Sequence, residues 1–150
     1  MNLDKLREEL AEDEGCKYEI YLDHLGLPTM GIGHLITKDD PEYGKDVGTV
    51  IEQSRVQSAF NLDIAVTIED CHRLYKDFDD LPEEVQLIIA NMMFNLGYPR
   101  LSKFKGMKAG VDARSWSSAA DEMVASRWYT QVPNRARRLV DRMRQIENDA

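Results

Sequence analysis

The chain contains few cysteines and no long apolar run. Its 150 residues include two cysteines, Cys16 and Cys71, which are too few for a disulfide framework, so we expect two free thiols in a reducing compartment. The longest apolar run lies around residues 87–90, far short of the roughly 20 residues that cross a bilayer, which predicts no membrane insertion. The first ten residues are charged and lack an apolar stretch, so we expect no signal peptide.

Basic residues are also fewer than acidic residues. The chain has 19 lysines and arginines against 27 acidic residues, a formal net charge of −8, which excludes nucleic acid as a partner bound through the overall field. Six arginines nevertheless lie between Arg127 and Arg144, where Asp141 is the sole acid. This stretch carries +5 and the rest of the chain −13, so any recognition of anions is expected to be local. An anion-binding helical module that uses these arginines is one alternative for the function.

The composition that remains is that of one globular domain, with 43% apolar and 31% charged residues. Apolar residues recur at helical spacing ahead of Gly15, a residue type that favours the end of a helix. Residues 17–23 alternate in polarity, with Tyr18, Ile20 and Leu22 on the expected half-buried side, and this pattern is typical of a strand. Most of the later sequence has helical periodicity. The sequence therefore predicts a small β-hairpin ahead of a mostly helical region.

The predicted fold class is α+β, mainly α, with a small N-terminal β-hairpin lobe and a helical C-terminal lobe joined by a long helix. The expected elements are helices over about 2–15, 56–75, 85–96, 101–109, 115–126 and 133–147, strands over 17–23 and 29–33, and a loop over 39–49. The expected organisation is a single domain over 1–150, with the hairpin lobe at about 12–50, the connecting helix at about 51–76, and the helical lobe at about 77–150 together with the first helix.

Two carboxylates, Glu14 and Asp23, lie nine residues apart in the hairpin region. Glu14 is expected at the C-terminal end of the first helix, where the helix dipole disfavours a negative charge and partial burial acts in the same direction. Asp23 is expected at the end of the first strand, on a more open hairpin. Two carboxyl groups in unlike environments are what glycoside hydrolysis requires. Acids at helix ends and turns are common, so the spacing alone favours two structural acids over a catalytic pair.

Three sequence blocks add a specific signal. The first combines DEG at 13–15, IYLD at 20–23 and TMGIGHLITK at 29–38; the second is NMMFNLG at 91–97; the third is SRWYTQVPNRARR at 126–138. In this order, across about residues 3–145, the chain resembles the T-even phage lysozymes, family 24 of the glycoside hydrolases. The resemblance implies a lysozyme-like two-lobed fold and an endolysin-type muramidase. Such an enzyme cleaves the β-1,4 bond between N-acetylmuramic acid and N-acetylglucosamine of bacterial peptidoglycan, with inversion and without a cofactor.

The resemblance also implies roles for individual residues. Glu14 is the general acid that protonates the leaving glycosidic oxygen, Asp23 is the ionised partner that directs a water, and Thr29 helps to hold that water. The supporting residues it implies are Arg135, which pairs with Glu14 and bridges the lobes, and His34, which forms an ion pair with Asp63; the implied substrate-binding residues are Gly33, Leu35 and Phe94. Two positions depart from the polar residues expected at the sugar or peptide subsites, because this chain has Met107 and Glu122 there.

Other chemistry finds less support in the sequence. The three histidines and two cysteines contain no pair with metal-ligand spacing, so no metal site is expected. Gly31 and Gly33 lack the remaining elements of a phosphate-binding loop, which favours a tight strand approached by substrate. A lytic transglycosylase or a chitin-type hydrolase remains an alternative within glycan chemistry.

The resemblance further implies a biological setting. We expect a monomer whose partner is peptidoglycan, held in the host cytoplasm and dependent on a membrane-permeabilising partner such as a holin for release to the cell wall and host cell lysis. Two alternatives keep the same fold: a virion-associated enzyme, and a non-catalytic module that binds the cell wall.

Overall fold

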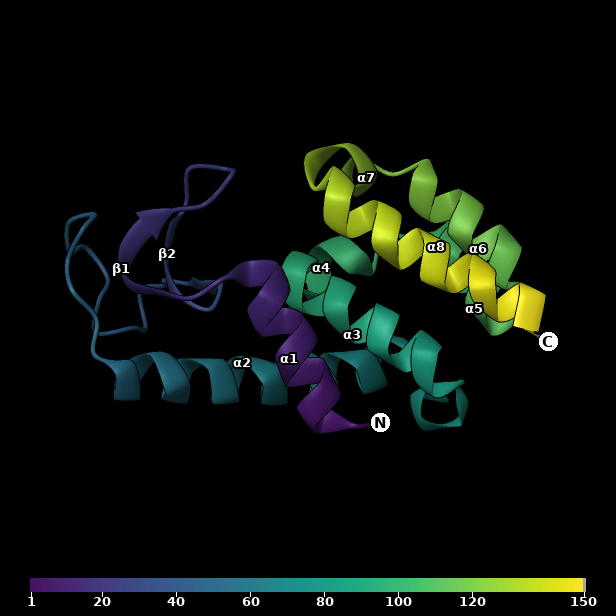
Figure 1. Cartoon of the computed structure of the whole chain (residues 1–150), viewed down its shortest axis with the longest axis horizontal. Helices are drawn as coiled ribbons and strands as arrows, with labels where there is room; N and C mark the ends of the chain where they lie inside the picture. Colours follow the sequence, from purple (N-terminus) through teal and green to yellow (C-terminus); the bar gives the residue numbers. More distant parts are fainter. Residues whose placement is uncertain (150) are drawn as a thin grey trace. The chain divides into compact units, whose positions relative to one another are not determined.

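The computed structural model describes residues 1–149 and confirms the predicted α+β, mainly α class (Figure 1). The elements follow in the order α1 (Leu3–Glu14), β1 (Lys17–Leu22), β2 (Pro28–Gly31), β3 (His34–Leu35), α2 (Gln53–Leu74), the 3-10 helix η1 (Phe78–Asp80), α3 (Glu83–Leu96), α4 (Tyr98–Leu101), α5 (Lys105–Asp112), α6 (Trp116–Val124), α7 (Arg127–Gln131) and α8 (Pro133–Asp149). Among these described helices, none combines the length and the apolar character that crossing a membrane requires.

The chain divides into two compact units. The N-terminal unit comprises Leu3–Glu69, and the C-terminal unit comprises residues 1–2 together with the chain from Asp70 onward. Helix α2 begins in the first unit and ends in the second, and its bounds agree with the long helix expected from the sequence. The lobe boundaries expected from the sequence stay a prediction.

The N-terminal unit is built on a three-stranded antiparallel sheet in the order β1-β2-β3. Directly opposite residues in such a sheet point to the same face. One row across the strands is Ile20, Met30 and His34, all buried; the neighbouring row is Tyr21, Thr29 and Leu35. The sheet therefore has one face in the core, and its second face carries Tyr21, Thr29 and Leu35.

Helix α1 contacts α2 in the same unit through a hydrogen bond of 2.7 Å from Arg7 Nη2 to Asn61 Oδ1.

The expected burial of the first strand is wrong in part. Ile20 is buried, but Tyr18 and Leu22 are 47% and 53% exposed. The ladder is irregular between Lys17 and Ile20, which takes Tyr18 out of the alternation, and Leu22 lies at the strand end. The second strand ends at Gly31 rather than 33, because the chain turns there and returns as the short strand β3, which the sequence analysis missed.

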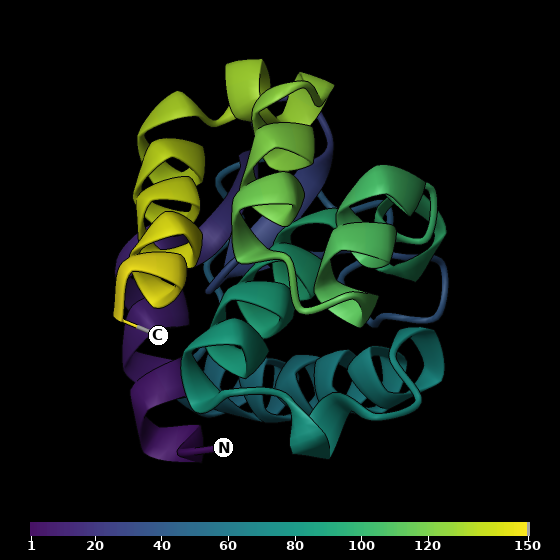
Figure 2. The same cartoon turned by 90° about the vertical axis from the view of Figure 1, so that its right-hand side faces the viewer.

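The C-terminal unit is centred on α3, which is buried over most of its length. Helix α8 packs against α3 and α6, and α6 also packs against α5 (Figure 2). The helix predicted at 85–96 is confirmed, and Gly97 ends it with a positive φ of 78°.

Two predicted boundaries in this unit need correction. A single helix over 101–109 is wrong, because the separate helix α4 begins at Tyr98, with Pro99 in its first turn, and the chain turns before α5 begins at Lys105. Helix α7 was missed; Ser126 caps it by accepting a hydrogen bond from Tyr129 N–H, and Pro133 starts α8 directly afterwards.

Candidate active site

Glu14 is the last residue of α1, and its half-buried carboxylate lies against the backbone of Gly33. A Cβ atom built on Gly33 would be 2.6 Å from Glu14 Oε1, closer than real Cβ atoms approach other atoms. Gly33 also has a φ of +64°, in the left-handed region that glycine tolerates best. A glycine at position 33 is thus favoured for two reasons: the turn into β3 needs its positive φ, and a Cβ atom would collide with the Glu14 carboxylate.

Asp23 organises the turn between β1 and β2. Its Oδ1 atom accepts hydrogen bonds from the N–H groups of Leu25 and Leu27, both at 2.9 Å, and its own N–H donates to the Leu27 carbonyl at 3.0 Å. Hydrogen bonds from backbone N–H groups to a carboxylate are strong and fix its orientation. Because both side-chain bonds end on Oδ1, the second oxygen, Oδ2, is left for other partners such as a water.

Thr29 lies on the sheet face next to these carboxylates. It is buried, pairs with Tyr21 on one side and with Leu35 on the other, and donates its hydroxyl proton to the Leu27 carbonyl at 3.0 Å. A hydroxyl that donates in this direction keeps its oxygen lone pairs for a further donor. Leu35, in contrast, is 46% exposed and offers apolar surface beside Thr29.

Tyr21 is a residue of this face that the sequence analysis did not select. Its pKa is raised by burial and then by the negative charges of Glu14 and Asp23, while a hydrogen bond from the Gly33 N–H to its oxygen acts in the opposite direction. Lys17 Nζ lies 4.5 Å from the centroid of its ring. Tyr21 is therefore near both carboxylates. The signal that could have found it is the period of two, which places it on the same side as Asp23.

His34 lies on the core face and joins the sheet to α2. Its Nδ1 is 2.7 Å from Asp63 Oδ2, the pair that the family resemblance implies, and its Nε2 is 3.0 Å from Asp40 Oδ2, a contact that was missed. The hydrogen bond to Asp63 raises the pKa of His34, burial opposes this shift, and Asp40 adds to it. Arg55 of α2 extends the network, because it binds Asp40 at 3.1 Å and the buried Glu42 at 2.7 Å.

The other two residues selected from the sequence belong to the C-terminal unit. Arg135 of α8 is buried and donates from Nε to Asn91 Oδ1 of α3 at 2.8 Å. Phe94 lies half-buried on the same helix α3. The expected pairing of Arg135 with Glu14 stays a prediction.

The N-terminal unit thus brings together a carboxyl group at a helix end, a second carboxylate held by backbone N–H groups, and a hydroxyl beside them. One proton donor, one anion and one water ligand are the groups that acid-assisted hydrolysis needs. Among the residues that the structure describes, no cluster of three or more His, Cys, Asp or Glu side chains could hold a metal ion.

Comparison with known proteins gives one consistent family. A family model described as phage lysozyme matches residues 11–147. The chain is 34% identical over 154 residues to a probable T4-type lysozyme 2 of Dictyostelium discoideum, which covers 90% of this chain and 91% of that protein. It is 27% identical to the pre-baseplate central spike protein Gp5 of Enterobacteria phage T4, over 89% of this chain and 26% of that protein. It is 26% identical to the peptidoglycan hydrolase gp36 of Pseudomonas phage phiKMV, over 91% of this chain and 15% of that protein.

Proposed function

Because the chain belongs to the phage lysozyme family, we propose that it hydrolyses the β-1,4 bond between N-acetylmuramic acid and N-acetylglucosamine in bacterial peptidoglycan. Membership makes the chain a glycoside hydrolase of the lysozyme type. The observation that carries the finer proposal is the placement of the Glu14 carboxylate against Gly33, in the unit that also holds Asp23 and Thr29.

Glu14 serves as the general acid. It is the last residue of α1, directly before the turn that leads into β1. Its contact with the backbone of Gly33 restricts where the carboxyl group can point. A fixed, protonated carboxyl group can deliver its proton to the glycosidic oxygen as the bond to the sugar breaks.

Asp23 and Thr29 supply the nucleophile. Asp23 is held by two N–H groups on Oδ1, so Oδ2 can accept a proton from a water, while the Thr29 oxygen accepts a second hydrogen bond from the same water. The oxygen of that water attacks the anomeric carbon from the face opposite the leaving group, with inversion. The charge of Asp23 also stabilises the positive charge that develops on the sugar ring.

The remaining selected residues support these steps. In this proposal Arg135 pairs with Glu14. Gly33 and Leu35 contact the sugar beside Thr29, and Phe94 forms a wall for the glycan. The pair of His34 with Asp63 holds the sheet on α2, so it positions the site without touching substrate.

We further propose that the enzyme acts in host cell lysis, as a monomer that waits in the host cytoplasm until a holin-like partner opens the membrane. A virion-associated role is the second candidate, and it is favoured by one observation: a relative is a central spike protein. The third candidate is a wall-binding module without activity, which has no need of a carboxyl group held beside Gly33.

The test is the clearing of chloroform-treated Gram-negative cells by purified protein. The unaltered chain is expected to clear them, and Glu14→Gln, which keeps the shape of the side chain, is expected to fail. Clearing by Glu14→Gln at the unaltered rate would refute the role of Glu14, and failure of the unaltered chain would favour the wall-binding module. Mass spectra of digested sacculi separate the enzymes, because hydrolysis leaves reducing muramic acid ends whereas a lytic transglycosylase leaves anhydro ends.

A further inference from the structure

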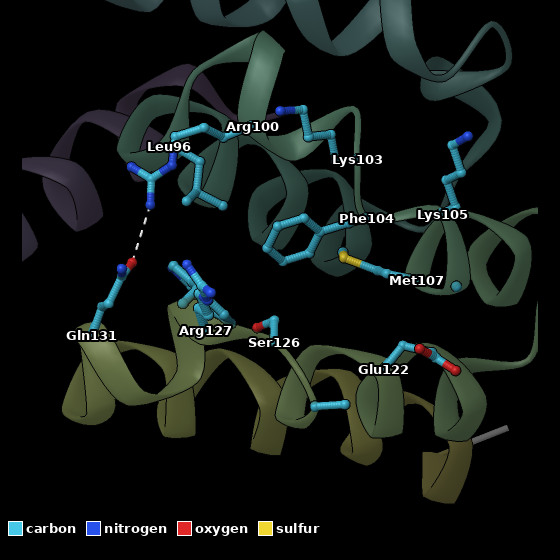
Figure 3. Close-up of a pocket in the computed structure, with 13 residues that line it drawn as sticks. Leu96, Arg100, Lys103, Phe104, Lys105, Met107, Glu122, Ser126, Arg127 and Gln131 are labelled. Atoms are coloured by element: carbon cyan, nitrogen blue, oxygen red, sulfur yellow. Dashed lines mark hydrogen bonds between the residues drawn. The ribbon is translucent and has the colours of Figure 1, made fainter.

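The C-terminal unit contains a groove of about 530 Å³ that is lined by Met107 and Glu122, among other residues (Figure 3). These two residues stand where the sequence analysis expected contacts with sugar or peptide, so the groove falls within the substrate site already proposed. A separate concentration of charge lies in the N-terminal unit, on the core face of the sheet. There two side chains, those of His34 and Arg55, bind three carboxylates, those of Asp40, Glu42 and Asp63.

This network holds the start of the long connection between β3 and α2 (Figure 1). We call this connection, residues 37–51, the strap; it is a series of turns. Its far end runs along the outer edge of β1, where Gly48 N–H donates to the Ile20 carbonyl at 2.7 Å and Ile20 N–H donates to the Thr49 carbonyl at 2.9 Å. The strap is therefore held by backbone hydrogen bonds at its far end and by charged side chains at its start.

His34 lies between two carboxylates. Its Nδ1 is 2.7 Å from Asp63 Oδ2, and its Nε2 is 3.0 Å from Asp40 Oδ2. Only the imidazolium form has an N–H on both nitrogens, whereas the neutral ring has one N–H and one lone pair. Loss of the proton therefore leaves one of the two carboxylates facing a lone pair, and the contact that was attractive becomes repulsive.

The two carboxylates differ in how they are held. Asp63 belongs to α2, a helix of 22 residues, and makes the shorter contact with His34. Asp40 belongs to the strap, and its carboxylate has other donors: Thr37 N–H at 2.8 Å on Oδ2, and Arg55 Nη2 at 3.1 Å on Oδ1. Asp40 can thus leave His34 without becoming an unpaired carboxylate and without bending a helix.

We propose that deprotonation of His34 releases Asp40 and loosens the start of the strap, while the pair of His34 with Asp63 persists. The neutral ring keeps its remaining N–H on Nδ1, directed at Asp63. The loosening is confined to about residues 37–41, because Glu42 keeps two hydrogen bonds from Arg55, at 2.7 and 2.9 Å, and the far end of the strap stays paired with β1. The strap is thus a pH-sensitive element built on one histidine.

The pH range follows from the groups that face His34. The hydrogen bond to Asp63 raises the pKa of His34, burial opposes this shift, and Asp40 adds to it. Arg55 and Glu42 are the other charged groups of the network, and they pair with each other. Since the pKa of His34 is raised, the strap is closed below about pH 6.5 and loosens as the pH rises through the raised value.

The test is nuclear magnetic resonance of the full chain, followed as His34 titrates between about pH 5 and 9. Proton–nitrogen correlation spectra of the imidazole show which ring nitrogen keeps its proton, and Nδ1 is the expected one. Amide exchange, corrected for its intrinsic pH dependence, is measured at Thr37, whose N–H donates to Asp40. Its protection is expected to fall about fivefold through the titration, as the loss of one net hydrogen bond predicts. Protection at Gly48 is expected to stay constant.

Asp40→Asn tests the carboxylate directly. The neutral amide attracts an imidazolium less and repels a lone pair less than a carboxylate does, so the change in protection at Thr37 is expected to shrink below about twofold. The pKa of His34 is expected to fall in this variant, because one of its two carboxylates is gone. Asp46→Asn, which removes the same charge from an exposed position of the strap outside the network, is expected to behave like the unaltered chain.

A neutral ring with its proton on Nε2 would overturn the proposal, because Asp63 would then be the carboxylate released. Constant protection at Thr37 through the titration would also overturn it, as would an undiminished change in Asp40→Asn. The first two outcomes are read on the unaltered chain, so they decide the matter even where Asp40→Asn fails to fold. No substrate is present in these measurements, so the result is independent of the proposed function.

Discussion

Replacing Gly33 with alanine tests whether the position of the Glu14 carboxyl group governs activity. The new Cβ atom would lie 2.6 Å from Glu14 Oε1 and 2.8 Å from its Cδ, so the carboxyl group has to move. Since these atoms are the far end of a flexible side chain, their displacement costs little stability. The φ of +64° adds about 1–2 kcal/mol of strain for a residue with a Cβ atom. For a chain of 150 residues this lowers Tm by about 2–8 °C.

The expected effect on activity is much larger than the effect on stability. A positioned general acid contributes about 10²–10⁴-fold to the rate, so kcat/KM is expected to fall at least about 100-fold at a temperature well below Tm. The assay is release of soluble fragments from purified sacculi, with thermal unfolding of the same samples followed by circular dichroism.

Gly31→Ala is the matched control. Gly31 has nearly the same φ, +60°, but its Cβ atom would meet Val56 Cγ1 at 2.8 Å instead of Glu14. Gly26→Ala adds the strain alone, because φ is +78° and nothing lies within 4 Å. Both controls are expected to lose stability and keep activity. A folded Gly33→Ala with the activity of Gly31→Ala would refute the reasoning.

Three further predictions concern single side chains. Asp23→Asn keeps Oδ1 as the acceptor for the turn, so Tm is expected to move little. The change removes the carboxylate that directs the water, so activity in sacculus digestion is expected to fall at least about 100-fold. A Tm loss like that of a core deletion would contradict this placement. Tyr21→Phe removes the oxygen that accepts from Gly33 N–H, and kcat is expected to fall about tenfold with KM unchanged; an unaltered kcat would count against a positioning role. The raised pKa of His34 means that its pairing stabilises the fold fully below about pH 6.5 and loses this effect as pH rises through the raised value. The Tm advantage of the unaltered chain over Asp63→Asn is therefore expected to be largest below about pH 6.5 and to shrink as the pH rises above it, and a difference that stays constant would contradict this.

The helix ends that the sequence predicted well are those with a local physical cause. Gly15 and Gly97 follow apolar helical periodicity, and both adopt the positive φ that only glycine adopts cheaply. The long helix α2 was equally clear from its period. Helix α7 has only five residues, too few to establish a period, and its single local signal is the capping residue Ser126.

The sequence indicated individual residues of the candidate site, but not the contacts that some of them make with one another. Glu14 and Asp23 were selected from spacing and from the family resemblance, and alternation places Tyr21 on the side of Asp23. Nothing local indicates that Gly33 brings its backbone to the Glu14 carboxylate, because that contact depends on the turn between β2 and β3. The contact of His34 with Asp40 was missed for the same reason, since it depends on the path of the loop after β3.

The anomeric configuration of the first product tests the central claim most directly, because it reports at once that the bond is hydrolysed and from which face water attacks. Proton nuclear magnetic resonance during the first minutes of sacculus digestion distinguishes the two anomers before they interconvert. A water directed by Asp23 and Thr29 onto a β-1,4 bond predicts the α-anomer of the reducing muramic acid. The β-anomer, or an anhydro product without a reducing end, would contradict the account.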